Sequence, residues 1–185
     1  MRYAWVALVC ACGPDAAKVC QDPKIAADLG VVSMADADLT ETDGKKFLNV
    51  PLNDDPEPDQ LQLELYPQVG VFVGGAVRPG TYSLDGAETK FSTCGACALL
   101  YQDVSADTGK PAGFYMPLAG TLVLTSTEGR LVGALENVVF RHVSIDFSDP
   151  DGTGPSLETT TIDDGCTVFL ERAAFDLEFA PTGPQ

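Results

Sequence analysis

Gln60-Leu61-Gln62-Leu63-Glu64-Leu65-Tyr66 decides the fold class of this 185-residue chain, because polar and apolar residues alternate along it without a break. Alternation with a period of two is typical of a β-strand that has one buried face. We therefore expect the leucines to point into a core, and Gln62 and Glu64 to point away from it.

Further strands are predicted on both sides of this one, at residues 47–52, 69–73, 81–84, 98–101, 120–127, 131–147 and 166–179. Bulges are expected near Glu136-Asn137 and near Arg172-Ala173, where the apolar parity of the last strand changes. No long amphipathic helix is found. Many short strands separated by turn residues predict an all-β domain, an antiparallel β-sandwich or a barrel-like domain. Its predicted aromatic core consists of Phe72, Phe140, Phe175 and Phe179.

The N-terminus has the pattern of a secretory signal peptide, with Arg2 followed by an apolar run over residues 3–11. Val9-Cys10-Ala11-Cys12 resembles a bacterial lipobox. The resemblance implies that residues 1–11 are a lipoprotein-type signal peptide, cleaved before Cys12, and that Cys12 is lipidated. More than one acyl chain would then anchor the protein stably to a membrane. There are two alternatives. The chain could be exported without a lipid, or its N-terminus could be a buried strand with two core thiols.

A tether and one domain are expected to follow. Residues 12–44 are acidic and have weak apolar periodicity, so they predict a tether that Cys20 pins to the domain. Within it, Asp22-Pro23 fits the start of one or two helical turns over residues 24–29. Residues 45–182 form the predicted all-β domain.

The formal net charge of −16 narrows the classes of partner. An electropositive surface for nucleic acid is not expected, nor is a polybasic attraction to anionic lipids. No apolar run approaches the roughly 18 residues that a membrane-spanning helix requires. The acidity favours solubility, with divalent-cation binding as the alternative.

Six cysteines indicate an oxidising compartment or a metal site. With Cys10 removed and Cys12 lipidated, the disulfide candidates are Cys20, Cys94, Cys97 and Cys166. Their pairing is open, and we favour bridges between distant positions over a tight Cys94–Cys97 ring. A redox pair at Cys94 and Cys97 would need a helix N-terminus to lower the thiol pKa. A zinc site would need Cys166 and His142 as further ligands.

Residues of a hydrolase triad, His142, Ser144 and Asp146, alternate along one predicted strand. Alternate residues on a strand lie about 6.6 Å apart, which is too far for the hydrogen bonds of a triad. The solvated face of a strand explains the three polar residues better. No catalytic residues and no cofactor are predicted.

Two acidic segments could attract cations. Asp149, Asp151 and Glu158 fit part of a calcium loop, but Phe147 takes its first ligand position. We interpret this segment as an acidic turn. The second segment predicts a surface loop because it contains two prolines. Its acidic residues are Asp54, Asp55, Glu57 and Asp59.

From Leu61 onward the chain resembles uncharacterised exported bacterial lipoproteins. The matching residues are Glu64-Leu65-Tyr66, Pro79-Gly80-Thr81-Tyr82, Thr93-Cys94-Gly95-Ala96-Cys97 and Asp164-Gly165-Cys166. This resemblance implies a lipid-anchored protein of the bacterial cell envelope, periplasmic or surface-exposed. It implies no activity.

The predicted function is a non-catalytic structural or binding role in the cell envelope. The partners would be the membrane, through the lipid, and an envelope protein or a glycan. Tyr101 and Tyr115 flank one loop and are weak evidence for a sugar-binding platform. The alternative is an envelope metal-binding or thiol-disulfide protein that uses the Cys94/Cys97 pair.

Overall fold

The computed structural model of the chain describes residues 18–21, 23–148 and 156–179. Its elements are β1 (Asp28–Ser33), β2 (Asp38–Thr42), β3 (Lys45–Pro51), β4 (Gln60–Leu65), η1 (Gly70–Phe72), β5 (Gly80–Ser83), η2 (Gly86–Thr89), β6 (Ala96–Gln102), β7 (Gly113–Ser126), β8 (Arg130–Asp146), β9 (Glu158–Thr161) and β10 (Thr167–Glu178).

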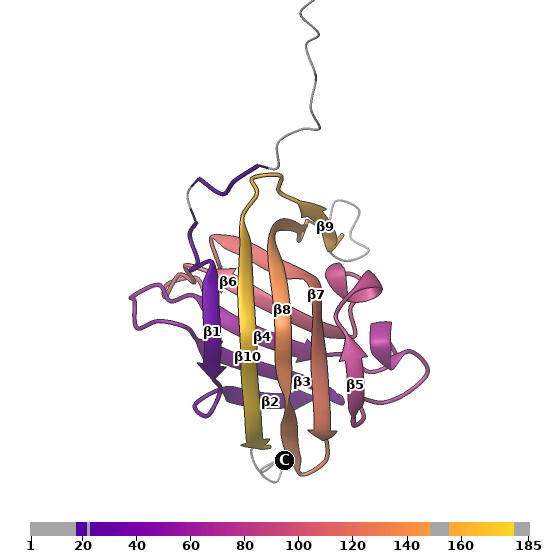
Figure 1. Cartoon of the computed structure of the whole chain (residues 1–185). Coiled ribbons are helices and arrows are strands. Elements are labelled where there is room, and N and C mark those ends of the chain that lie inside the picture. Colours follow the sequence, from indigo (N-terminus) through magenta and orange to yellow (C-terminus); the bar gives the residue numbers. More distant parts are fainter. Residues whose placement is uncertain (1–17, 22, 149–155, 180–185) are drawn as a thin grey trace, which may run out of the picture.

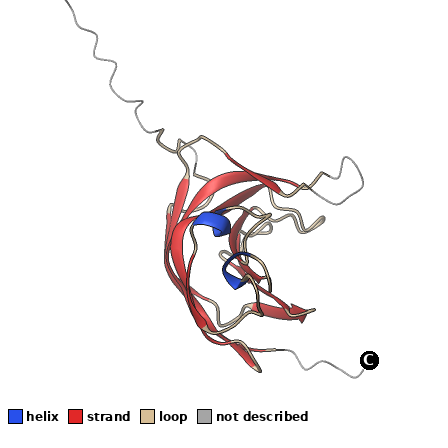
Figure 2. Cartoon of the chain, turned by 90° about the vertical axis from the view of Figure 1, so that its right-hand side faces the viewer, coloured by secondary structure: helices blue, strands red, loops and turns tan. Residues whose placement is uncertain are grey.

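The strands of the described residues form one ten-stranded sheet with the order β1-β10-β8-β7-β6-β4-β3-β2. The short strands β5 and β9 extend it by pairing with β7 and β8. The β1–β10 pair is parallel, and the other pairs are antiparallel. The sheet curls into a half-barrel (Figure 1), and the two short 3-10 helices η1 and η2 lie on its concave side (Figure 2). The prediction of an all-β, barrel-like domain is confirmed.

Local irregularities bend the long strands at the predicted places. Asn137 has a φ of 51°, and the β7–β8 register shifts on the opposite side between Ala119 and Thr121. In β10, Glu171 is an extra residue between Leu170 and Arg172 where β1 pairs with it. Each extra residue turns the following side chains to the other face of the sheet, which explains the change of apolar parity.

The main core fills the concave side of the sheet. Leu61, Leu63 and Leu65 on β4 are fully buried in it, as the alternation predicts. Of the predicted aromatic core, Phe72, Phe140 and Phe175 are buried, while Phe179 is half-buried at its edge. The outward prediction for Glu64 is only half right, since this side chain points away from the core but is 5% exposed.

The N-terminal tether was predicted too long. Residues 28–33 and 38–42 are part of the sheet, because β1 pairs with β10 and β2 pairs with β3. The expected helical turns over residues 24–29 are also absent from the structure, and Ile25 is buried in the core instead. An edge strand such as β1 is half exposed and pairs with the far end of the chain, so its local sequence carries little periodicity.

Two other sequence predictions are corrected. Residues 69–73 contain η1 (Gly70–Phe72) rather than a strand, since Gly70 adopts a φ of 51° that an extended chain does not allow. Asp59 is 7% exposed rather than part of a surface loop. Its carboxylate accepts hydrogen bonds from the backbone N–H of Asp103, at 3.0 Å, and from the side-chain amide of Asn53, at 3.3 Å.

Candidate functional site

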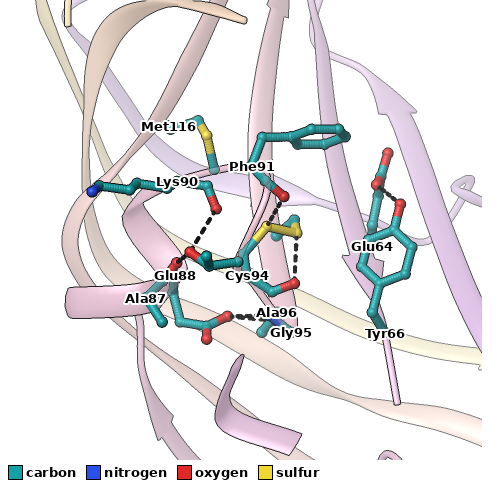
Figure 3. The surroundings of a disulfide bond; sticks show 12 residues. Glu64, Tyr66, Ala87, Glu88, Lys90, Phe91, Cys94, Gly95, Ala96 and Met116 are labelled. Carbon is teal, nitrogen blue, oxygen red and sulfur yellow. Dashed lines mark hydrogen bonds between the residues drawn. A yellow bond between two sulfur atoms is a disulfide. The ribbon is translucent and has the colours of Figure 1, made fainter. Parts of the chain in front are cut away.

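Cys94 and Cys97 form a disulfide at the start of β6 (Figure 3), and a second disulfide joins Cys20 to Cys166, 146 residues away. The expectation of long-range bridges is right for Cys20–Cys166 and wrong for Cys94–Cys97. A tight ring forms because the chain turns sharply at Gly95 before β6 begins. Both sulfurs of this ring belong to buried residues, with Cys94 2% and Cys97 0% exposed.

Glu88 of η2 organises the backbone around this ring. Its carboxylate accepts hydrogen bonds from the N–H groups of Gly95 (2.8 Å), Ala96 (2.6 Å) and Val71 (2.9 Å). Burial raises the pKa of Glu88, and the three N–H donors partly offset this rise. One side chain, 1% exposed, therefore ties η1, η2 and the start of β6 together.

The backbone here is packed so closely that it requires glycine. A Cβ on Gly95 would lie 2.1 Å from the carbonyl oxygen of Val69, and a Cβ on Gly70 would lie 2.3 Å from the nitrogen of Gly95. Neither contact can relax without moving backbone. The sequence does not predict this close contact between the backbones at Gly70 and Gly95. The two glycines themselves are consistent with it.

The loop before the disulfide is held from several sides. The N–H of Cys94 donates to the carbonyl of Lys90 at 3.0 Å, and the Thr93 hydroxyl donates to the carbonyl of Ala87 at 2.7 Å. The N–H of Phe91 donates to the hydroxyl of Thr159 on β9 at 2.9 Å. Phe91 is thereby fixed in position beside the disulfide (Figure 3).

A second hydrophobic cluster lies on the face of the sheet opposite the main core. It consists of Cys94, Cys97, Leu99, Met116, Val143 and Ile145. Strand alternation explains it: Ala96, Ala98 and Leu100 on β6 face the main core, while the residues between them face outward. The register places Glu64 opposite Cys97, Gln62 opposite Leu99, and Gln60 opposite Tyr101.

Four aromatic side chains pack against this second cluster, and two further rings contact them. We call these six residues the outer aromatic surface: Tyr66, Phe91, Tyr101 and Phe114 on the cluster, with Phe47 and Phe147 beside them. Ring centroids lie 5.6 Å apart for Tyr101–Phe114, 5.7 Å for Phe114–Phe147 and 5.9 Å for Phe91–Phe147. Phe47 and Tyr66 form another pair at 5.9 Å. Phe147 is 51% exposed, and the other five are half-buried.

Glu64 sits at the centre of this surface. Its carboxylate accepts hydrogen bonds from the hydroxyl of Tyr66 and from the side-chain amide of Gln62, the latter at 2.6 Å. Burial raises the pKa of Glu64, while hydrogen bonds from Tyr66 and Tyr101 act in the opposite direction. Burial and the neighbouring carboxylate raise the pKa of both tyrosines, so they remain neutral donors at physiological pH.

A small cleft of about 200 Å³ opens between the outer aromatic surface and the disulfide loop. Its walls include the aromatic rings of Tyr66 and Phe91, and its other lining residues are Val69, Ser92, Cys94 and Leu157. Because the Cys94–Cys97 ring and the Phe91–Thr159 hydrogen bond fix one wall, the cleft is formed without a ligand.

His142 has a different partner from the one its sequence neighbours suggest. Its Nδ1 lies 2.6 Å from a carboxylate oxygen of Asp164, and its ring stacks on Tyr115 with centroids 4.8 Å apart. Asp146 instead accepts the N–H of Ser148 at 2.8 Å, and Ser144 is exposed. His142, Ser144 and Asp146 therefore do not form a triad with one another. Burial of Asp164 is outweighed by hydrogen bonds from His142 and from the N–H of Cys166, which lower its pKa.

The metal sites considered from the sequence do not assemble in the described part of the chain. Cys94, Cys97 and Cys166 are all in disulfides, so they are not available to bind zinc with His142. Asp149 and Asp151 lie outside the described residues, and Glu158 pairs with Asp146 at the start of β9. Within residues 18–21, 23–148 and 156–179, no group of three or more His, Cys, Asp or Glu side chains is arranged to hold a metal ion.

Comparisons with protein-family models, with curated protein sequences and with solved structures returned no match. Among the residues that the structure describes, no helix is both long and apolar enough to cross a membrane. The outer aromatic surface and its cleft are thus the candidate site on geometric grounds alone.

Proposed function

We propose that this chain is an exported, lipid-anchored protein of the bacterial cell envelope that binds a partner through its outer aromatic surface and performs no catalysis. The observation that carries the proposal is the pairing of Cys20, Cys94, Cys97 and Cys166 in two disulfides. Structural disulfides persist in oxidising compartments and are rare in the cytosol. Disulfide pairing therefore supports export, and the sequence Val9-Cys10-Ala11-Cys12 supports a lipid on Cys12.

The binding role rests on the contrast between the two faces of the sheet. The concave side is filled by its own core, whereas the other face ends in half-buried aromatic rings around one carboxylate. Half-exposed aromatic groups beside a preformed cleft are typical of recognition sites. Tyr101 belongs to this surface, but Tyr115 is 1% exposed in the main core, so the two tyrosines do not form one platform.

The lipid anchor is tested by expressing the full chain in a Gram-negative bacterium. We expect a processed product that begins at Cys12, carries acyl chains by intact mass, and sediments with membranes. Cys12→Ser should abolish both acylation and membrane retention. Cys10→Ser is the matched control, because the same apolar run then still precedes an intact Cys12. Equal membrane retention of both variants would contradict the lipid anchor.

The alternative is a thiol-disulfide or metal-binding role for the Cys94/Cys97 pair. The two-residue spacing favours it, but exchange requires a thiolate to reach a sulfur, and both residues are buried. Cys97→Ser would leave Cys94 free to trap a mixed disulfide with a substrate protein. Such trapped adducts, or stoichiometric zinc in the purified wild-type protein, would support the alternative. A fully oxidised, metal-free chain with no adducts would support the binding role.

A further inference from the structure

We infer that the outer aromatic surface binds a neutral glycan, with one sugar ring in the cleft between Tyr66 and Phe91. This inference rests on the proposed binding function and names the class of its ligand.

A row of polar side chains on β3 and β4 points outward, on the same face as the aromatic rings. Asn49 donates to Gln60 at 3.0 Å, and Gln62 donates to Glu64 at 2.6 Å. Primary amides carry both donors and acceptors, and a carboxylate carries acceptors only. This combination matches sugar hydroxyl groups, each of which can donate and accept.

The aromatic rings lie next to this polar row. Tyr66 bonds to Glu64 with its hydroxyl and also lines the cleft with its ring, so the polar row and the apolar cleft meet at one residue. Phe91 stands on the other side, held by its N–H bond to Thr159. A sugar ring has apolar C–H faces and a polar rim, so it can stack on an aromatic ring while its hydroxyls reach the amides.

The charge of the chain limits the class of ligand. The net charge of −16 repels nucleic acids, acidic polysaccharides and anionic membranes. The central carboxylate is 5% exposed and already accepts bonds from Tyr66 and Gln62, so it does not present an open anion to a basic protein. At the edge, the ammonium of Lys45 lies 5.9 Å from the Tyr66 ring centroid. A neutral polyhydroxyl ligand is the class that the surface fits.

The test uses the purified oxidised chain and three neutral probes: hexamers of β-1,4-glucose, of β-1,4-N-acetylglucosamine and of α-1,4-glucose. Calorimetry and chemical-shift changes of the tyrosine rings should reveal binding of at least one probe. Tyr66→Ala and Phe91→Ala should each weaken that binding by about tenfold or more, and Gln62→Ala by a smaller factor. Tyr66→Phe keeps the ring and should keep most of the affinity.

Phe169→Ala is the matched control, because Phe169 is 36% exposed on β10 and belongs to no part of the surface. It should leave the affinity unchanged. Circular dichroism establishes that each variant is folded. If Tyr66→Ala does not fold, Phe91→Ala still tests the inference.

The inference is overturned if no probe binds at millimolar concentration, or if binding is unaffected by both Tyr66→Ala and Phe91→Ala. Binding of oligolysine in place of the sugars would assign the surface to a basic partner and would also overturn it. These results leave the lipid anchor untouched, since acylation of Cys12 is measured separately. A chain that binds sugar without acylation would instead contradict the proposed function and uphold the ligand class.

Discussion

The carboxylate of Glu88 accepts the backbone N–H of Ala96 at 2.6 Å, directly between the two cysteines of the Cys94–Cys97 disulfide. Glu88 also binds the N–H of Gly95 and, through Val71, fixes η1. A buried carboxylate thus satisfies three backbone donors that no strand pairs. Glu88 consequently stabilises the backbone that forms one wall of the candidate cleft.

Replacement of this carboxylate should be costly. We expect Glu88→Ala to lower the free energy of unfolding by about 3 kcal/mol, because three buried N–H groups lose a charged acceptor. Urea denaturation followed by circular dichroism measures the change. Glu57→Ala is the control, since Glu57 is exposed in the loop after β3 and its removal should change stability by less than about 0.5 kcal/mol. Equal effects of the two variants would show that the Glu88 bonds contribute little.

The two disulfides should differ in their contribution to stability. In the chain-entropy model, the Cys20–Cys166 bridge spans 146 residues and stabilises by about 5 kcal/mol, whereas a ring as short as Cys94–Cys97 contributes about 2 kcal/mol. We therefore expect the Cys20→Ala/Cys166→Ala double variant to lose more stability than Cys94→Ala/Cys97→Ala. Chemical denaturation of both, compared with the oxidised wild type, measures the difference. The reverse order would mean that packing around the buried ring outweighs loop closure.

The close packing of Gly95 against Val69 predicts that a larger residue at position 95 is destabilising. Gly95→Ala should destabilise by more than about 3 kcal/mol, because the added Cβ would lie 2.1 Å from the carbonyl oxygen of Val69. Gly74→Ala provides the comparison: Gly74 has a φ of +78° but no atom within 4 Å of its added Cβ. Only the backbone strain of about 1 kcal/mol should appear there. Similar melting temperatures for the two variants would contradict the close packing at Gly95.

The strand pattern could be predicted from the sequence where a strand buries one face. Leu61, Leu63 and Leu65 illustrate this, because local alternation and final burial agree. Pairing between segments that are distant in the chain could not be predicted, because it has no signal in the local sequence. The parallel pairing of β1 with β10 joins segments at opposite ends of the chain, and the turn at Gly70 interrupts an apolar run that by composition resembles a strand.

The candidate site was harder to predict than the fold. Glu64 and Tyr66 lie two residues apart, so a shared outward face was foreseeable from the alternation alone. Burial of Glu64 was not, because it depends on Tyr101 and Gln62, and Tyr101 comes from another part of the chain. Glu88 and Asp164 have no distinguishing sequence signal, since each acts through groups brought close only by the folded sheet.

The pH dependence of stability should report the buried carboxylate of Glu64. Burial raises its pKa above the usual 4.5, so the folded state holds this proton more tightly than the unfolded state. The associated stability is complete below pH 4.5 and is lost as the pH rises through the folded-state pKa. Glu64→Gln cannot titrate, and its free energy of unfolding should fall less steeply between pH 4.5 and 7 than that of the wild type.

Denaturant titrations at half-unit pH steps measure both slopes, with Glu57→Gln as the control for removing one negative charge from an exposed position. Glu57→Gln should keep the wild-type slope, because its side chain is exposed in the loop after β3. Parallel curves for all three proteins would show that Glu64 ionises alike in the folded and unfolded states. A carboxylate in that condition would be solvated, and the closed hydrogen-bond network of Glu64, Tyr66 and Gln62 would then not describe the outer aromatic surface in solution.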